Sequence, residues 1–210
     1  MVAERTDQRR EAGQRTRDQL LSAAVELIAQ RGPEGVTLRE ITDRARANVS
    51  AVSYHFGSLK ALCDAAIEHA LERYLDAQIK AVDSLDTTSD VEDLAAAFAG
   101  PMVSALAAGG RDLAIMRTVA RVGIDPPAGW DRLTAKFQQS RQDVTRQLSA
   151  RLPGVGEQEL NFRIRCAAGL LNWLALAPVG AELAAEPPGQ IERWLIPVVA
   201  GAFSGSPNTG

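Results

Sequence analysis

Along most of the chain, apolar residues recur three or four positions apart, which is the spacing of a helix that buries one face. No stretch alternates apolar and polar residues over the length of a strand. Glycine and proline pairs separate the apolar segments and mark turns between them. This pattern predicts an all-α protein of about nine helices without an internal repeat.

The first apolar stripe predicts a helix over residues 16–30, which Gly32-Pro33 would end. Residues 1–14 are polar and carry mixed charges. Two interpretations stay open for them: a flexible tail, or a basic arm that reaches DNA phosphates or the minor groove beside a main binding site.

Two short helices are expected next, and the first begins at a recognisable cap. Thr37 and Glu40 have the spacing of a capping box, so a helix should begin at Leu38. Val36 and Ile41 lie at the positions of a hydrophobic staple. Apolar residues at helical spacing carry this helix to about residue 45.

A second helix of about two turns should follow Asn48, because asparagine is a favoured N-cap residue. Val52 and Phe56 would face the interior. Gly57 would break the helix, and Ser58 would cap a longer one that begins near residue 59. The other side chains of the short helix would lie outside or at its edge: Val49, Ser50, Ser53, Tyr54 and His55.

Residues 37–60 therefore have the pattern of a helix-turn-helix, whose second helix enters the major groove of DNA. The small Ser and Ala side chains would allow close approach, and Tyr54 and His55 could reach phosphates. The alternative is an ordinary corner between helices, which is common in helical proteins.

The apolar pattern of the helix from residue 59 is lost around residues 83–89. Because this helix would run from the first half of the chain into the second, it is expected to transmit a conformational change between them. Five further helices are expected, at residues 91–108, 111–122, 130–152, 157–176 and 190–203.

The composition is that of an ordinary globular protein, with 46% apolar and 23% charged residues and a net charge of -3. Residues 1–60 hold ten Lys and Arg against eight Asp and Glu, so the weak positive balance falls where DNA binding is expected. Cys63 and Cys166 lie among apolar residues and are expected to be buried free thiols in a reducing cytoplasm. We expect neither a signal peptide nor a membrane span.

Catalysis has little support in the sequence. The chain holds two histidines, His55 and His69, and no motif of metal-ligand spacing or nucleophile elbow. Gly154 and Gly156 lack the third glycine and the preceding strand of a dinucleotide-binding motif. We expect no enzyme activity, metal or cofactor, and we interpret His69 as structural rather than as a ligand or switch residue.

The segment NVSAVSYHFGSLKAL, preceded by a capping-box helix, resembles the DNA-binding domain of the TetR family of transcriptional regulators, in the branch that carries a YHFGS element. The resemblance is strong over residues 15–65. It implies that several residues contact DNA: Thr37, Arg39, Val49, Ser50, Ser53, Tyr54 and His55. Asn48 and Lys60 are added as candidates at the start of the second short helix and of the long helix.

Three positions depart from the pattern of the family. Arg46 replaces the usual glycine of the turn, so the chain must either adopt a left-handed backbone there or bend differently. The usual phosphate-binding lysine is displaced, because Leu59 takes its place and Lys60 follows. Thr42 replaces a usual alanine after Ile41.

By the resemblance, the second half of the chain binds a ligand and dimerises through its last two helices. Those helices carry more apolar surface than one core face needs, although burial within a single chain is the alternative. Apolar cavity walls are expected from Met102, Leu106, Met116, Val119, Trp130, Phe137, Leu171 and Trp173, with polar contacts from Arg117, Arg121 and Asn172. These side chains have an alternative role too, as simple core or as solvated or paired arginines.

The sequence thus predicts a flexible arm (1–14), a helix-turn-helix DNA-binding domain (15–58), a ligand-binding and dimerisation domain (59–204) and a flexible tail (205–210). The predicted function is that of a cytoplasmic homodimeric regulator, a repressor in preference to an activator. It would bind a palindromic double-stranded operator and be released by a small-molecule effector. The alternative is a helical protein-interaction module that has lost DNA binding.

Overall fold

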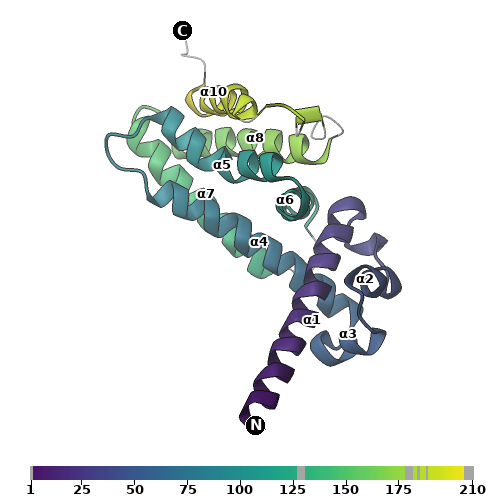
Figure 1. The fold of residues 1–210 in the computed structure, drawn as a ribbon. Helices are drawn as coiled ribbons and strands as arrows, with labels where there is room; N and C mark the ends of the chain where they lie inside the picture. The colour runs from purple at the N-terminus through teal and green to yellow at the C-terminus, as the bar shows by residue number, and fades with distance from the viewer. Residues whose placement is uncertain (1, 127–130, 178–181, 184, 188, 206–210) are drawn as a thin grey trace. The chain divides into compact units, whose positions relative to one another are not determined.

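The computed structural model describes residues 2–126, 131–177, 182–183, 185–187 and 189–205. Within them the chain forms nine α-helices, one 3₁₀ turn (Pro33–Gly35) and no strand, which confirms the all-α prediction (Figure 1). The helices are α1 (Val2–Arg31), α2 (Leu38–Ala45), α3 (Val49–Phe56), α4 (Leu59–Asp83), α5 (Val91–Ala108), α6 (Gly110–Ile124), α7 (Asp131–Arg151), α8 (Glu157–Leu176) and α10 (Gln190–Ser204).

The chain divides into two compact units, Met1–Ala70 and Leu71–Gly210, and α4 contributes to both. The predicted domain boundary at residue 59 stays a prediction. The first half of α4 lies in the first unit, with Leu62, Ala66 and Ile67 completely or almost completely buried.

The expected start of the first helix near residue 16 was wrong, because α1 is helical from Val2. Short-range side-chain pairs link successive turns of α1 over residues 11–18. Arg15 Nη2 lies 3.2 Å from the Glu11 carboxylate, and Gln14 Nε2 donates to Asp18 at 2.9 Å. Pairs at this spacing stabilise an exposed helix, and a search for apolar periodicity does not detect them.

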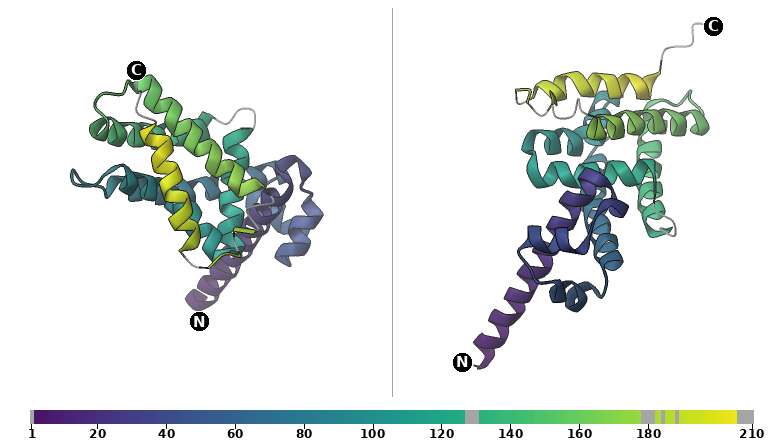
Figure 2. Two further views of the ribbon diagram at one scale, coloured as in Figure 1. Left: turned by 90° about the horizontal axis from the view of Figure 1, so that it is seen from above. Right: turned by 90° about the vertical axis from the view of Figure 1, so that its right-hand side faces the viewer.

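In the second unit, α10 crosses α5 and α8, and the apolar faces of these helices form one core with α6 and α7 (Figures 1 and 2). The rings of Phe98 and Phe203 meet edge to face at 5.4 Å within it. Among the described helices, α5 alone is long and apolar enough to cross a membrane. Leu94, Phe98 and Met102 of α5 are buried in this core, which is the ordinary reason for such a composition in a globular fold.

A buried polar bridge joins three helices of the second unit. Gln78 of α4 donates to the carbonyl of Phe98 in α5 at 2.8 Å, and the Ser140 hydroxyl of α7 donates to Gln78 Oε1 at 2.7 Å. Gln78 and Ser140 are almost fully buried, and this bridge satisfies their polar groups. It therefore fixes the register of α4 against α5 and α7.

The two cysteines differ in environment. Cys63 is buried, and loss of solvation raises the pKa of its thiol to about 11. Cys166 is exposed, so the expectation of two buried thiols was wrong at this position. It lies on the side of α8 opposite Ile164, Ala167 and Leu171, which face the core.

Candidate DNA-binding surface and ligand cavity

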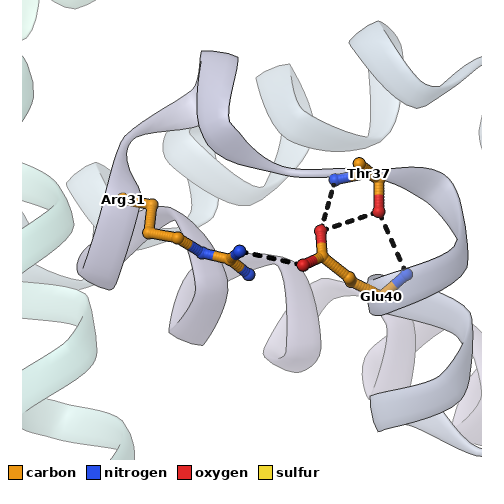
Figure 3. A network of polar contacts seen from close by, with 3 residues as sticks. All are labelled: Arg31, Thr37 and Glu40. Atoms are coloured by element: carbon orange, nitrogen blue, oxygen red, sulfur yellow. Dashed lines mark hydrogen bonds and ion pairs between the residues drawn. The ribbon is translucent and has the colours of Figure 1, made fainter.

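The start of α2 is held by the expected capping box, extended by an arginine (Figure 3). The Thr37 N–H donates to Glu40 Oε2 at 3.0 Å, and the Glu40 N–H donates to Thr37 Oγ1 at 3.3 Å. Arg31 Nη1 donates to Glu40 Oε1 at 2.8 Å across the intervening loop. The hydrogen bonds from Thr37 and Arg31 lower the pKa of Glu40 to about 2. Sequence reasoning missed Arg31, because no local motif indicates a partner nine residues away.

Of the two expected geometries at Arg46, the turn between α2 and α3 has the left-handed backbone. Arg46 adopts the left-handed conformation, with φ 52° and ψ 40°, and it is the only described residue other than glycine with a positive φ. Its N–H donates to the Asp43 carbonyl at 3.3 Å, and the Ala47 N–H donates to the Thr42 carbonyl at 3.0 Å. The chain thus keeps a C-cap of the kind that usually uses glycine.

The substituted threonine at position 42 is also accommodated. Its side chain is buried, and its hydroxyl donates to the carbonyls of Leu38 and Arg39 at 3.1 and 3.0 Å. A threonine hydroxyl satisfied by the preceding turn fits inside a helix without leaving an unpaired polar group.

The boundaries of α3 agree with the prediction. Asn48 Oδ1 accepts a hydrogen bond from the Ser50 N–H at 3.1 Å and so caps the start of the helix. Gly57, with φ 81°, ends it and donates to the carbonyls of Val52 and Ser53. Ser58 Oγ then accepts from the Ala61 N–H at 3.1 Å and caps α4. The caps at its two ends therefore fix α3 as a short helix with defined boundaries.

One face of α3 is exposed in the way a binding surface requires. Val52 is buried, whereas Tyr54 is 84% and Val49 is 47% exposed. Ser50 and Ser53 are exposed beside them, and His55 is half-buried with its ring 4.8 Å from that of Tyr54. We call Val49, Ser50, Ser53 and Tyr54 the outer face of α3. An exposed tyrosine next to small polar residues offers both an apolar ring and a hydroxyl to a partner.

Phe56 is half-buried, and the guanidinium of Arg17 lies over its ring at 5.2 Å from the centroid. This cation–π contact joins α1 to the end of α3, and sequence reasoning missed Arg17 because the contact spans two helices.

The other candidates for DNA contact lie at the helix starts. The Thr37 hydroxyl and the Asn48 side-chain oxygen are engaged in their caps. Arg39 is exposed, with Nε 3.9 Å from the Asp43 carboxylate, and Lys60 Nζ lies 2.7 Å from Asp64. Exposed pairs of this kind hold their cations weakly, so both side chains can exchange their partner for a phosphate.

The second unit contains a cavity of about 530 Å³, lined by residues of α4, α5, α6, α7 and α8. Four residues predicted for a ligand site line it: Val119, Phe137, Leu171 and Asn172. Met102, Leu106 and Met116 do not, and are buried in the helical core instead. Their helical positions place them on core-facing sides of α5 and α6, a distinction that apolar composition alone does not make.

The remaining candidates for ligand contact are scattered. Arg117 Nε donates to the carbonyl of Ala175 at 3.1 Å, Arg121 is half-buried and Trp173 is exposed, and none of these three lines this cavity. Trp130 lies outside the described residues. Sequence reasoning missed the residues of α4 and two arginines, Arg141 and Arg165, which do line it.

The capped pair of short helices, with an exposed second helix followed by a helical unit around a cavity, defines a helix-turn-helix protein of the regulatory kind. The chain belongs to the tetR family of bacterial regulatory proteins, whose model matches residues 20–66. A second model, that of the tetracyclin repressor-like C-terminal domain, matches residues 96–202. The family consists of regulators and not of enzymes, as expected from the sequence.

Individual proteins resemble the chain over different lengths. The HTH-type transcriptional repressor NicS of Pseudomonas putida is 30% identical over 97 residues, which are 46% of each protein. The chain thus spans less than half the length of the curated relatives it matches.

Solved structures match over nearly the whole chain. The TetR family transcriptional regulator PfmR from Thermus thermophilus has a TM-score of 0.66 at 16% identity, covering 89% of this chain and 98% of the other. A SmeT–triclosan complex has a TM-score of 0.59 at 21% identity, covering 89% and 90%. Such likeness shows the fold.

Proposed function

We propose that this protein is a homodimeric transcriptional repressor that binds a palindromic operator and is released by a small molecule. The observation that carries the proposal is the outer face of α3, which is exposed, small and polar around Tyr54, and held between two caps. A regulator of this kind acts where the DNA is, so the proposal places it in the bacterial cytoplasm.

In the proposed complex, the outer face of α3 lies in the major groove, with Ser50 and Ser53 near base edges and Tyr54 at the groove or its phosphates. Thr37, Arg39, Asn48, His55 and Lys60 flank this face and would contact the DNA backbone. The N-terminal turns of α1 are a further backbone contact in this proposal. The similarity to a protein named as a transcriptional repressor supports repression over activation.

Dimerisation is supported by an apolar surface on α8 and α10. Phe162 and Trp173 on α8 and Trp194 and Val198 on α10 are each more than half exposed. Helical spacing puts Phe162 and Trp173 on one stripe of α8, and α10 packs against the same helix. A surface of large exposed apolar side chains is typical of an interface, and a second copy of the chain would cover it with a two-fold axis.

Response to a ligand is supported by the cavity and by the continuity of α4. Tyr74, Leu75 and Gln78 of α4 line the cavity, and the same helix begins directly after α3 and its cap. A ligand that displaces α4 would change the separation of the two recognition helices, which must match successive major grooves about 34–36 Å apart. To shift the population strongly, it must bind the released state better by about 5.5 kcal/mol. The SmeT–triclosan complex shows that a relative of the same fold holds a small molecule.

The proposal is tested first by selecting bound sequences from random duplex DNA. We expect enrichment of a palindrome, because a two-fold dimer presents two identical α3 helices. Absence of enrichment, together with affinity that does not depend on salt, would favour the alternative of a protein-interaction module.

The outer face is tested with Ser50→Ala and Tyr54→Phe on the selected operator. Each should weaken binding by roughly 1–3 kcal/mol, the range for a lost specific contact, measured by fluorescence anisotropy. Ser149→Ala, an exposed change on α7, is the control and should leave affinity unaltered. If both outer-face variants bind like the wild type, the assignment of α3 is incorrect.

The dimer is tested by sedimentation equilibrium on Trp173→Glu, which puts a charge into the apolar stripe. We expect dissociation to monomers with unchanged helical circular dichroism. Gln138→Glu, exposed on α7 outside the stripe, is the matched control and should stay dimeric.

A further inference from the structure

We infer that the cavity of the second unit takes an amphipathic carboxylate, with Arg141 and Arg165 holding the carboxylate and the apolar wall enclosing the rest of the molecule. This inference rests on the proposed function, because it names the chemical class of the effector for the same cavity.

The charge of the lining has one sign. Among the described residues that line the cavity, Arg141 of α7 and Arg165 of α8 are charged, and none is an aspartate or a glutamate. Two other arginines of the same helices have carboxylate partners, Arg146 in Asp143 and Arg163 in Glu159, and a third, Arg151, donates to backbone carbonyls and to Gln147. Within the described residues, neither Arg141 nor Arg165 forms such a pair. Two guanidinium groups without a counter-charge favour an anion as the third component.

The uncharged polar groups of the lining are also compatible with an anionic ligand. Gln78 and Ser140 are satisfied by each other and by the Phe98 carbonyl. Tyr74 and Asn172 also line the cavity, and among the described residues the Tyr74 hydroxyl and the Asn172 amide make no hydrogen bond. Burial raises the pKa of Tyr74, so its hydroxyl stays protonated and can donate. Tyr74 and Asn172 can each donate to a ligand acceptor, and the two guanidinium groups, which only donate, give the lining its excess of donors.

The rest of the lining is largely apolar and favours a ligand with a hydrocarbon chain or ring. It includes Leu75, Phe98, Val119, Val122, Ile164 and Leu171. The cavity volume of about 530 Å³ falls in the usual range of about 300–1,000 Å³ for small-molecule sites. Such a wall binds a chain or ring system by removing its surface from water.

The polar and apolar parts lie at different depths. Leu75, Ile164 and Leu171 are buried, whereas Arg141 is half-buried and Arg165 is exposed. Arg165 and Asn172 share one face of α8, two turns apart. A carboxylate at the arginines would keep part of its hydration while the hydrocarbon goes inward, which avoids the cost of burying a charge alone.

The experiment compares three probes of equal chain length on the full-length protein: octanoate, 1-octanol and octylammonium. Binding is measured by isothermal titration calorimetry on the wild type, on Arg141→Gln/Arg165→Gln and on Arg146→Gln. Arg146 is exposed on α7 and is not among the residues of the cavity, so it is the matched control. Circular dichroism checks that each variant is folded.

We expect the wild type and Arg146→Gln to bind octanoate at least about tenfold more tightly than 1-octanol, with octylammonium weakest, since charge-assisted hydrogen bonds distinguish the head groups. The double variant should bind octanoate and 1-octanol within about twofold of each other, with its 1-octanol affinity unchanged. Equal binding of octanoate and 1-octanol by the wild type would overturn the inference. So would a preference that survives in the double variant, or binding of none of the three probes.

A second measurement separates this inference from the proposed function. Octanoate is added to the complex of the protein with its selected operator, and DNA release is followed by anisotropy. Octanoate that binds through the arginines without releasing DNA supports the ligand class and contradicts the proposed effector role. A neutral compound that binds the cavity and releases the DNA, with no preference for octanoate, supports the effector role and contradicts the ligand class.

Discussion

Replacing Arg46 by glycine should stabilise the helix-turn-helix. Arg46 has φ 52° and ψ 40°, a backbone that costs an L-residue roughly 1–2 kcal/mol and costs glycine almost nothing. Its side chain is exposed and, within the described residues, makes no hydrogen bond or ion pair, so its removal loses no contact. The greater conformational freedom of glycine in the unfolded chain lowers the free energy of unfolding by about 0.4–1 kcal/mol. The net expectation is a gain of about 0.5–1 kcal/mol.

The matched control is Ala47→Gly, one residue further along the chain. Ala47 does not have a positive φ, so glycine there relieves no strain and should destabilise by about 0.4–1 kcal/mol. The two variants add the same residue at neighbouring positions, and only the backbone conformation distinguishes them.

The assay is amide hydrogen exchange of Ile41, whose N–H donates to the Thr37 carbonyl at 3.2 Å at the start of α2. Exchange through opening of the first unit should be about two- to fivefold slower in Arg46→Gly and correspondingly faster in Ala47→Gly. If Arg46→Gly speeds exchange as Ala47→Gly does, the left-handed geometry of the turn is incorrect. Operator affinity is measured separately, because Arg46 could also contact a phosphate.

Three further predictions concern single groups. The pKa of Glu40 is lowered from 4.5 to about 2 in the folded protein. The contribution of its ionised carboxylate to the free energy of unfolding is therefore complete above about pH 4.5 and is lost as the pH falls toward 2. A carboxyl NMR titration of the folded protein with a midpoint near 4.5 would contradict the capping network. Gln78→Leu should lower the free energy of unfolding, measured by urea denaturation, by about 1–3 kcal/mol, because it leaves the buried Ser140 hydroxyl unpaired. Adding Ser140→Ala should recover part of this stability. A double variant no more stable than Gln78→Leu would argue against the buried bridge. Arg163 is only 13% exposed and donates to the carbonyls of Phe203 and Ser204 at the end of α10. Arg163→Ala should therefore lower the free energy of unfolding by about 1–3 kcal/mol in urea denaturation. A loss as small as that of Arg146→Ala, at an exposed arginine, would refute this role.

The site was predictable from sequence where its chemistry is local. Thr37 with Glu40, Asn48, Gly57 and Ser58 act on backbone groups two to five residues away, so their spacing alone predicted where α2, α3 and α4 begin and where α3 ends. The exposure of Tyr54 and the burial of Val52 followed from the period of the helix.

Contacts between distant segments were not predictable in this way. Arg17 on Phe56, Arg31 on Glu40 and the bridge through Gln78 join residues whose separation has no regular spacing. The same reason explains why the cavity residues were predicted only in part. Apolar residues on α5 and α6 look alike in sequence, and packing decides whether a methionine such as Met116 fills the core or a valine such as Val119 lines the cavity.

The sequence by itself determined the helical class and the caps that begin α2, α3 and α4, because these depend on spacings shorter than two helical turns, and its resemblance to the TetR family indicated the family. The tertiary structure decided the left-handed turn at Arg46, the exposure of Cys166 and the gathering of Arg141 and Arg165 at one cavity. These features depend on which helix faces lie against each other, and that is a property of the packed chain rather than of any one segment.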